Sequence, residues 1–224
     1  MLLLAADTSG KNGSIALARV SPGQNDIEIV EAVPLAGGTF SAQLVPQISA
    51  LLEKHGYRKS DLAGFAVVSG PGSFTGLRVG LAAIKALAEI LRKPICSVSL
   101  LEAVASSGAT RGRVLAALDA GRGEVYAGDY LAEAAAHMHS ERLLSREEFI
   151  TESKGKTVIT PDPALAEIAR AAGIHVEQIR YPDGRVIARL GWSKLERGET
   201  VSPEALDANY IRRSDAEIFS KPKF

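Results

Sequence analysis

The order of short apolar runs and amphipathic helices constrains the fold of this chain more than any other feature. In the first half, three strand-like runs precede an alternation of helices and strands. The expected strands cover 2–6, 14–20, 27–33, 65–69 and 95–98, and the expected helices cover 41–55, 74–92 and 100–106. The turn-forming Ser21-Pro22-Gly23 separates the second and third strands. This order predicts a mixed α/β unit built on one sheet.

The second half repeats the opening of the first. The composition shifts at Ser106-Ser107-Gly108, and an apolar strand that ends in an acidic turn follows. The expected strands here cover 114–118, 124–130 and 137–143, and the helices cover 146–153, 163–172 and 185–198. We therefore predict two duplicated lobes of β-β-β-α-β-α type, residues 1–106 and 107–224, with the C-terminal segment packing back on the first lobe.

Charge and cysteine content narrow the class of protein. The 26 basic and 26 acidic side chains give a formal net charge of zero, which disfavours direct tRNA binding because proteins that grip phosphates usually show a basic excess. The single cysteine, Cys96, excludes an intramolecular disulfide and fits a reducing compartment. Since no apolar run approaches the roughly 20 residues that span a bilayer, we expect a cytoplasmic protein without membrane contact.

The densest motif is the glycine-rich block from Ser69 to Gly80, and with it the sequence resembles the TsaB/YeaZ family. Further segments resemble the family in the same order along the chain. They are Asp7-Thr8-Ser9, Leu115 to Tyr126, and Ala208 to Arg213. The resemblance thus spans nearly the whole chain, and the glycine-rich block is its most specific part.

The resemblance implies a two-lobed actin/Hsp70-like fold and a role in making threonylcarbamoyladenosine at the tRNA adenosine beside the anticodon. It implies a non-catalytic scaffold or activator that pairs with a catalytic TsaD-type subunit and works with a small TsaE-type ATPase. On this view tRNA is reached only indirectly, through the complex. A homodimer is expected in isolation, because a surface that pairs with a paralogue can pair with itself.

No catalytic residue and no metal site are expected in this chain. The catalytic paralogue carries a His-x-x-x-His helix, and the matching positions here hold Leu100 and Val104, which cannot ligate a cation. His137 and His139 share a strand face but have no acidic or cysteine partner nearby in the sequence. Cys96 lies in an apolar strand and is expected to be a buried structural residue.

Two hypotheses remain open for the acidic turns. Asp7 and Asp119 could cap their own turns, or they could contact a nucleotide shared with the partner. The second hypothesis places ATP or ADP with Mg²⁺ at the partner interface, with no tightly bound cofactor. Its contact residues are Asp7, Thr8, Ser9, Gly72, Ser73 and Asp119. The alternative function is an ATP-binding or ATP-hydrolysing enzyme of the actin-like superfamily, which the absence of a Gly-Gly adenosine motif disfavours.

The expected helix at 74–92 is apolar around most of its circumference. Such a helix is buried on more than one side, either between its own sheet and helices or against a partner. Gly76, Gly80 and Ala83 form a flat strip that would let another backbone approach. The expected partner interface consists of Leu44, Gln47, Ile48, Leu51, Phe74, Gly76, Leu77, Gly80, Leu81, Ala83, Ile84 and Leu87.

Overall fold

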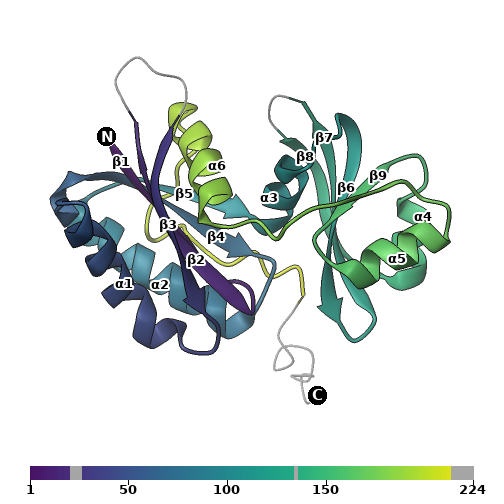
Figure 1. Ribbon diagram of the computed structural model, residues 1–224, viewed down its shortest axis with the longest axis horizontal. Helices are drawn as coiled ribbons and strands as arrows, with labels where there is room; N and C mark the ends of the chain where they lie inside the picture. Colours follow the sequence, from purple (N-terminus) through teal and green to yellow (C-terminus); the bar gives the residue numbers. More distant parts are fainter. Residues whose placement is uncertain (21–26, 134–135, 213–224) are drawn as a thin grey trace, which may run out of the picture. The chain divides into compact units, whose positions relative to one another are not determined.

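A computed structural model describes residues 1–20, 27–133 and 136–212 of the chain (Figure 1). The turn expected at 21–23 and Arg213 lie outside the described residues. The chain forms two compact units. The first contains Met1–Ala103 and Tyr181–Ala208, and the second contains Val104–Arg180 with the described residues from Asn209 onward.

The first unit is built on a five-stranded sheet in the order β3-β2-β1-β4-β5. Its strands are β1 (Leu2–Asp7), β2 (Asn12–Arg19), β3 (Glu28–Ala36), β4 (Leu62–Gly70) and β5 (Ile95–Ser99). The pairs β1–β2 and β2–β3 are antiparallel, whereas β1–β4 and β4–β5 are parallel. Its helices are α1 (Phe40–Lys54), η1 (Lys59–Asp61), α2 (Phe74–Leu91) and α6 (Gly184–Glu196), and α3 (Leu100–Ser107) follows β5.

Helices cover both faces of this sheet (Figure 1). Leu2 and Leu4 of β1 belong to the core cluster that includes the buried residues of α1 and α2. Successive strand side chains point to opposite faces, and Leu3 lies on the other face, close to Gly191 of α6. Every residue of β1 is therefore buried, as the sequence pattern of continuous apolar residues predicts for a strand covered on both sides.

The second unit repeats this architecture. Its elements are β6 (Gly112–Gly121), β7 (Glu124–Ala132), β8 (Ala136–Ser145), α4 (Arg146–Glu152), β9 (Thr157–Thr160), α5 (Pro163–Ala171) and β10 (Val176–Gln178). The strand order β10-β9-β6-β7-β8 is that of the first sheet, with β6 in the place of β1. The core between the sheet and helices α4 and α5 is apolar and includes Leu115, Ala127 and Phe149. The predicted duplicated α/β fold is confirmed.

Two strands of the second unit were not predicted. β9 has four residues and β10 has three, which is too short for a periodic pattern to stand out from the flanking loops. β9 pairs in parallel with β6, and β10 pairs in parallel with β9. Tertiary pairing, rather than a local signal, makes these residues strands.

The compact units divide the chain differently from the expected lobes 1–106 and 107–224. The division after Ala103 falls within α3, and the helix expected at 185–198 in the second lobe packs on the first unit as α6. The Gly184 N–H donates to Ser14 Oγ of β2 at 2.8 Å, and the bond is buried. Leu206 also lies in the core of the first unit, whereas Asn209 bonds Glu141 of the second.

None of the helices in the described part of the chain is long and apolar enough to cross a bilayer.

Candidate functional site

The turn after β1 is closed on itself and buried. Asp7 Oδ1 accepts hydrogen bonds from Ser9 N at 2.8 Å and from Ser9 Oγ at 2.6 Å. Burial raises the pKa of Asp7 above its usual range, and the two bonds from Ser9 oppose that shift without cancelling it. Asp7 thus caps its own turn, as one of the two hypotheses predicts.

Gly76 and Gly80 of α2 allow this turn to lie directly against the helix surface. A Cβ at Gly76 would lie 2.1 Å from Thr8 O, and a Cβ at Gly80 would lie 2.3 Å from Thr8 Oγ1. Thr8 Oγ1 also donates to Gly76 O at 2.7 Å. The strip of small residues therefore lets another segment approach closely, as predicted, but that segment is the chain's own turn at Thr8. The assignment of Gly76 and Gly80 to a partner interface is wrong, because these positions are filled from within the first unit.

The turn after β6 is more open and has an acidic neighbour that the sequence did not indicate. Asp119 is exposed, and its Oδ1 accepts from Gly121 N at 3.1 Å. Its own N–H donates to Asp162 Oδ2 at 2.7 Å. Burial raises the pKa of Asp162. Asp162 follows β9, a strand that was not predicted, so no sequence signal placed it beside Asp119.

The residues expected to contact a nucleotide do not form an open site in the first unit. Asp7, Thr8 and Ser9 are buried, and their polar atoms bond within the unit. Ser73 is exposed at the start of α2, where its Oγ accepts from Gly76 N at 3.3 Å. Of the expected contacts, Ser73 and Asp119 have exposed side chains, and they belong to different units. The buried turn does not fit a nucleotide or its Mg²⁺.

The remaining candidates for chemistry are unreactive or isolated. Cys96 is a buried free thiol, and burial raises its pKa to about 11, so it is not a thiolate nucleophile near neutral pH. Leu100 and Val104 are buried on α3. His137 and His139 are exposed on β8, and no group of three potential metal ligands occurs among the described residues.

Most of the expected interface residues lie in the core of the first unit. They are Leu44, Ile48, Leu51, Gly76, Leu77, Gly80, Leu81 and Ile84, and all are buried. Gln47, Phe74, Ala83 and Leu87 are partly exposed. The buried members pack within the first unit, because the strongest periodic stripe of a helix packs on its own sheet first. Contact of the four partly exposed members with a partner stays a prediction.

A second, weaker stripe faces away from the core on the same two helices. It contains small and apolar residues, which we call the α1–α2 face. The exposed members are Ala42, Val45, Pro46, Ser49 and Ala50 on α1, and Ala82, Ala86 and Ile90 on α2. Ile90 is 78% exposed and Val45 is 50% exposed. The two helices contact each other and cover the same face of the sheet (Figure 1). The spacing of four between Ala82, Ala86 and Ile90 could have revealed this stripe in the sequence.

Comparisons with known proteins agree on one family. The family model described as TsaD, tRNA N6-adenosine threonylcarbamoyltransferase, matches residues 34–181. The tRNA threonylcarbamoyladenosine biosynthesis protein TsaB of Bacillus subtilis is 37% identical over 131 residues, which are 58% of this chain and 55% of that protein. The protein of the same name from Escherichia coli is 28% identical over 231 residues, covering 96% of both chains.

Solved structures show the same fold. YeaZ from Pseudomonas aeruginosa superposes with a TM-score of 0.74 at 25% identity, over 93% of this chain and 100% of that chain. A ROK family protein from Streptococcus pneumoniae superposes with a TM-score of 0.51 at 10% identity, over 89% of this chain and 100% of that chain. The similarity extends over both units, and the actin-like fold class is confirmed.

Proposed function

The chain belongs to the TsaB/YeaZ family, within the wider family that the TsaD model describes, and from this we propose that it is a non-catalytic subunit in tRNA threonylcarbamoyladenosine biosynthesis. It acts as a scaffold or activator by forming a heterodimer with a catalytic TsaD-type subunit. The modified position is the tRNA adenosine adjacent to the anticodon.

The closed turn at Asp7 supports a non-catalytic role. An actin-like enzyme would offer this acid to a bound nucleotide and metal ion, whereas Asp7 is buried and its Oδ1 accepts two hydrogen bonds from Ser9. Gly76 and Gly80 of α2 pack closely against Thr8, and Gly72, just before α2, packs closely against Ser9. ATP or ADP with Mg²⁺ at the partner interface stays a prediction of the family resemblance.

The α1–α2 face is the observation that supports pairing with a TsaD-type subunit. Small side chains and a proline keep this surface low, so that the helices of a partner can approach closely, and Val45 and Ile90 provide large apolar contacts. Burial of apolar area there is favourable by about 25 cal/mol per Å². We propose that this face, rather than the buried stripe expected from the sequence, packs against the TsaD-type subunit.

Three further partner assignments accompany this proposal. Without the catalytic subunit, the same face pairs with a second copy of the chain, as in an isologous dimer. A TsaE-type ATPase joins the complex, on the family resemblance alone. On the same resemblance, tRNA is reached only indirectly, through the complex, and the complex works in the cytoplasm.

Reconstitution with charge-bearing variants tests the proposal. Ala86→Arg places a cation in the middle of the exposed stripe of α2, whereas Ala171→Arg is a matched change at an exposed position of α5 in the second unit. We expect Ala86→Arg to abolish both copurification with the TsaD-type subunit and threonylcarbamoylation of tRNA, and Ala171→Arg to retain both. The self-association of each variant is measured by light scattering.

The outcomes separate the competing functions. Modification that proceeds equally well without this chain would remove the scaffold role. Turnover of ATP by the isolated chain that is lost in Asp7→Asn would favour the actin-like ATPase instead. An Ala86→Arg chain that still binds the catalytic subunit would move the interface away from the α1–α2 face.

A further inference from the structure

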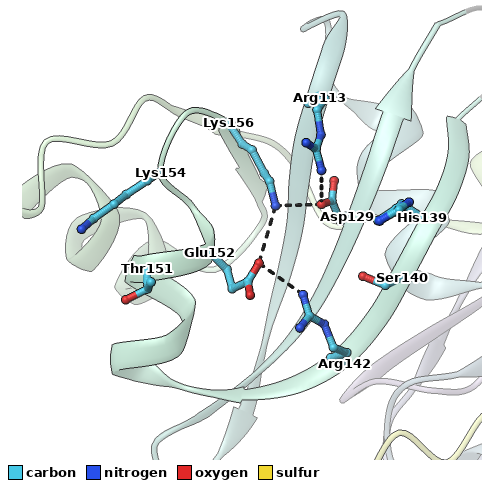
Figure 2. A pocket seen from close by; sticks show the side chains of 9 residues that line it. All are labelled: Arg113, Asp129, His139, Ser140, Arg142, Thr151, Glu152, Lys154 and Lys156. Atoms are coloured by element: carbon cyan, nitrogen blue, oxygen red, sulfur yellow. Dashed lines mark hydrogen bonds and ion pairs between the residues drawn. The ribbon is translucent and has the colours of Figure 1, made fainter.

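The second unit contains an open polar pocket that the proposed function does not use. Its volume is about 630 Å³, within the range of roughly 300–1,000 Å³ that is common for ligand sites. The lining residues come from β6, β7, β8, α4 and the segment between α4 and β9 (Figure 2). They are Arg113, Asp129, His139, Ser140, Arg142, Thr151, Glu152, Lys154 and Lys156.

The pocket continues the face of the sheet that carries the apolar core. Residues two apart on a strand share a face, and three strands each pair a core residue with a pocket residue. The pairs, core residue first, are Leu115 and Arg113 on β6, Ala127 and Asp129 on β7, and Leu144 and Arg142 on β8. The same sheet face therefore changes from apolar to charged along its strands.

Three cations and two carboxylates alternate across the pocket (Figure 2). Asp129 Oδ2 accepts from Arg113 Nη2 at 2.8 Å and from Lys156 Nζ at 2.7 Å. Glu152 Oε2 lies 3.7 Å from Lys156 Nζ and 3.2 Å from Arg142 Nη2. The two carboxylates thus hold Arg113, Lys156 and Arg142 in fixed positions around one space.

Asp129 is the buried anchor of this arrangement. Its side chain is 6% exposed, whereas those of Arg113 and Arg142 are 61% and 51% exposed. Burial acts to raise the pKa of Asp129, but Lys156 and Arg113 outweigh it and hold the pKa below its usual range. Oδ1 is buried without a hydrogen-bond partner among the described residues, so the two cations are what keep this carboxylate ionised. The acid positions the cations, and the arginines remain accessible to solvent.

The charge of the pocket is positive although that of the chain is zero. Four cationic side chains against two carboxylates leave an excess of two positive charges. Lys154 is exposed at the rim and forms no ion pair with the other described residues. The hydroxyl of Ser140 adds a donor to the lining. An excess of N–H and O–H donors around half-exposed arginines suits an anion with several oxygens.

We propose that this pocket binds a phosphate group. Two sources share that chemistry: a phosphorylated small molecule and the phosphodiester backbone of RNA. A divalent cation is disfavoured because both carboxylates are already paired with cations, and no group of three potential metal ligands occurs among the described residues.

The test compares two variants of the full chain that lose the same charge from the second unit. Arg142→Gln with Lys154→Gln alters the pocket and leaves the Asp129 anchor in place. Arg146→Gln with Arg180→Gln removes two exposed arginines that do not line the pocket. Binding of inorganic phosphate is measured by calorimetry, and binding of labelled unmodified tRNA is measured by fluorescence anisotropy over a series of salt concentrations. Circular dichroism confirms that both variants fold.

We expect the pocket variant to lose affinity by about tenfold or more, since charged hydrogen bonds are removed, and the control variant to bind nearly as the wild type. Loss of tRNA affinity, with a shallower salt dependence, assigns the site to an RNA backbone whether or not phosphate binding also falls. Loss of phosphate affinity alone assigns it to a phosphorylated small molecule. Equal binding by the two variants for both probes, or no binding of either probe by the wild type, overturns the proposal.

Discussion

The contact between Thr8 and Gly80 predicts that Gly80→Ala lowers the stability of the wild-type chain but raises the stability of a Thr8→Ala chain. A Cβ there would lie 2.3 Å from Thr8 Oγ1, and the next atoms of Thr8 are 3.5 and 3.6 Å away. Thr8 is 2% exposed, and its hydroxyl cannot turn aside without losing the bond to Gly76 O. The hydroxyl oxygen is therefore the one atom that forbids a side chain at this position.

The magnitudes follow from two opposing effects. Replacing a glycine inside a helix with alanine gains about 1 kcal/mol, whereas overpacking a filled site costs about 1–3 kcal/mol. At 2.3 Å we take the upper part of that range, so Gly80→Ala should destabilise the wild-type chain by about 1–2 kcal/mol. In a Thr8→Ala background the clash is absent, and the same change should stabilise the chain by up to about 1 kcal/mol. The coupling energy is then about 2–3 kcal/mol, as for residues in direct contact.

Urea unfolding of the four chains measures this coupling. Trp192 is the only tryptophan in the sequence and is buried on α6 in the first unit, so its fluorescence reports the unit that contains Thr8 and Gly80. Equal effects of Gly80→Ala in the two backgrounds would refute the reasoning. The reasoning would also be refuted if Gly80→Ala stabilised the chain that retains Thr8. In that case Gly76 and Gly80 could again be considered for a partner interface. For the same reason, a bulky substitution at Gly80 reports on the fold and is unsuitable as a probe of the interface.

Two further predictions concern buried polar groups in the first unit. Because burial raises the pKa of Asp7 above 3.8, its contribution to stability is complete below pH 3.8 and falls as the pH rises through the folded-state pKa. Asp7→Asn, whose amide oxygen can keep both bonds from Ser9, should remove that fall from a pH series of urea unfolding, and an unchanged series would contradict the assignment. Ser14→Ala deprives the buried Gly184 N–H of its acceptor and should lower the free energy of unfolding by about 1–3 kcal/mol, followed by the fluorescence of Trp192; no loss would mean that water replaces the hydroxyl.

Long elements were predictable because their signals are local. The continuous apolar run at 2–6 and the helical spacing at 74–92 appear in the structure as β1 and α2, with ends within one or two residues. The duplicated order of strands and helices followed from these elements alone. The short strands β9 and β10 gave no such signal, since their strand conformation depends on the pairing of β9 with β6 and of β10 with β9.

The sequence could not predict on which of the two sheets α6 packs. By sequence order this helix closes the second repeat, yet Gly184 and Gly191 bring it against Ala16 and Ala66 of the first sheet. A glycine in a helical pattern indicates that another segment packs closely against the helix, but the sequence does not show which segment it is. The strip at Gly76 and Gly80 illustrates the same limit, because the close neighbour is the chain's own turn.

The sequence by itself determined the fold class, the repeated order of elements and the family, since all three depend on residue types at fixed spacing along the chain. The tertiary structure alone decided which apolar stripe of α1 and α2 is core and which is surface, because both stripes have helical spacing and only packing on the sheet distinguishes them. It also decided the charge of the pocket. Arg113, Asp129, Arg142 and Lys156 are scattered over more than forty residues of a neutral chain. Their charges act together only because neighbouring strands and the segment after α4 bring them within ion-pair distance.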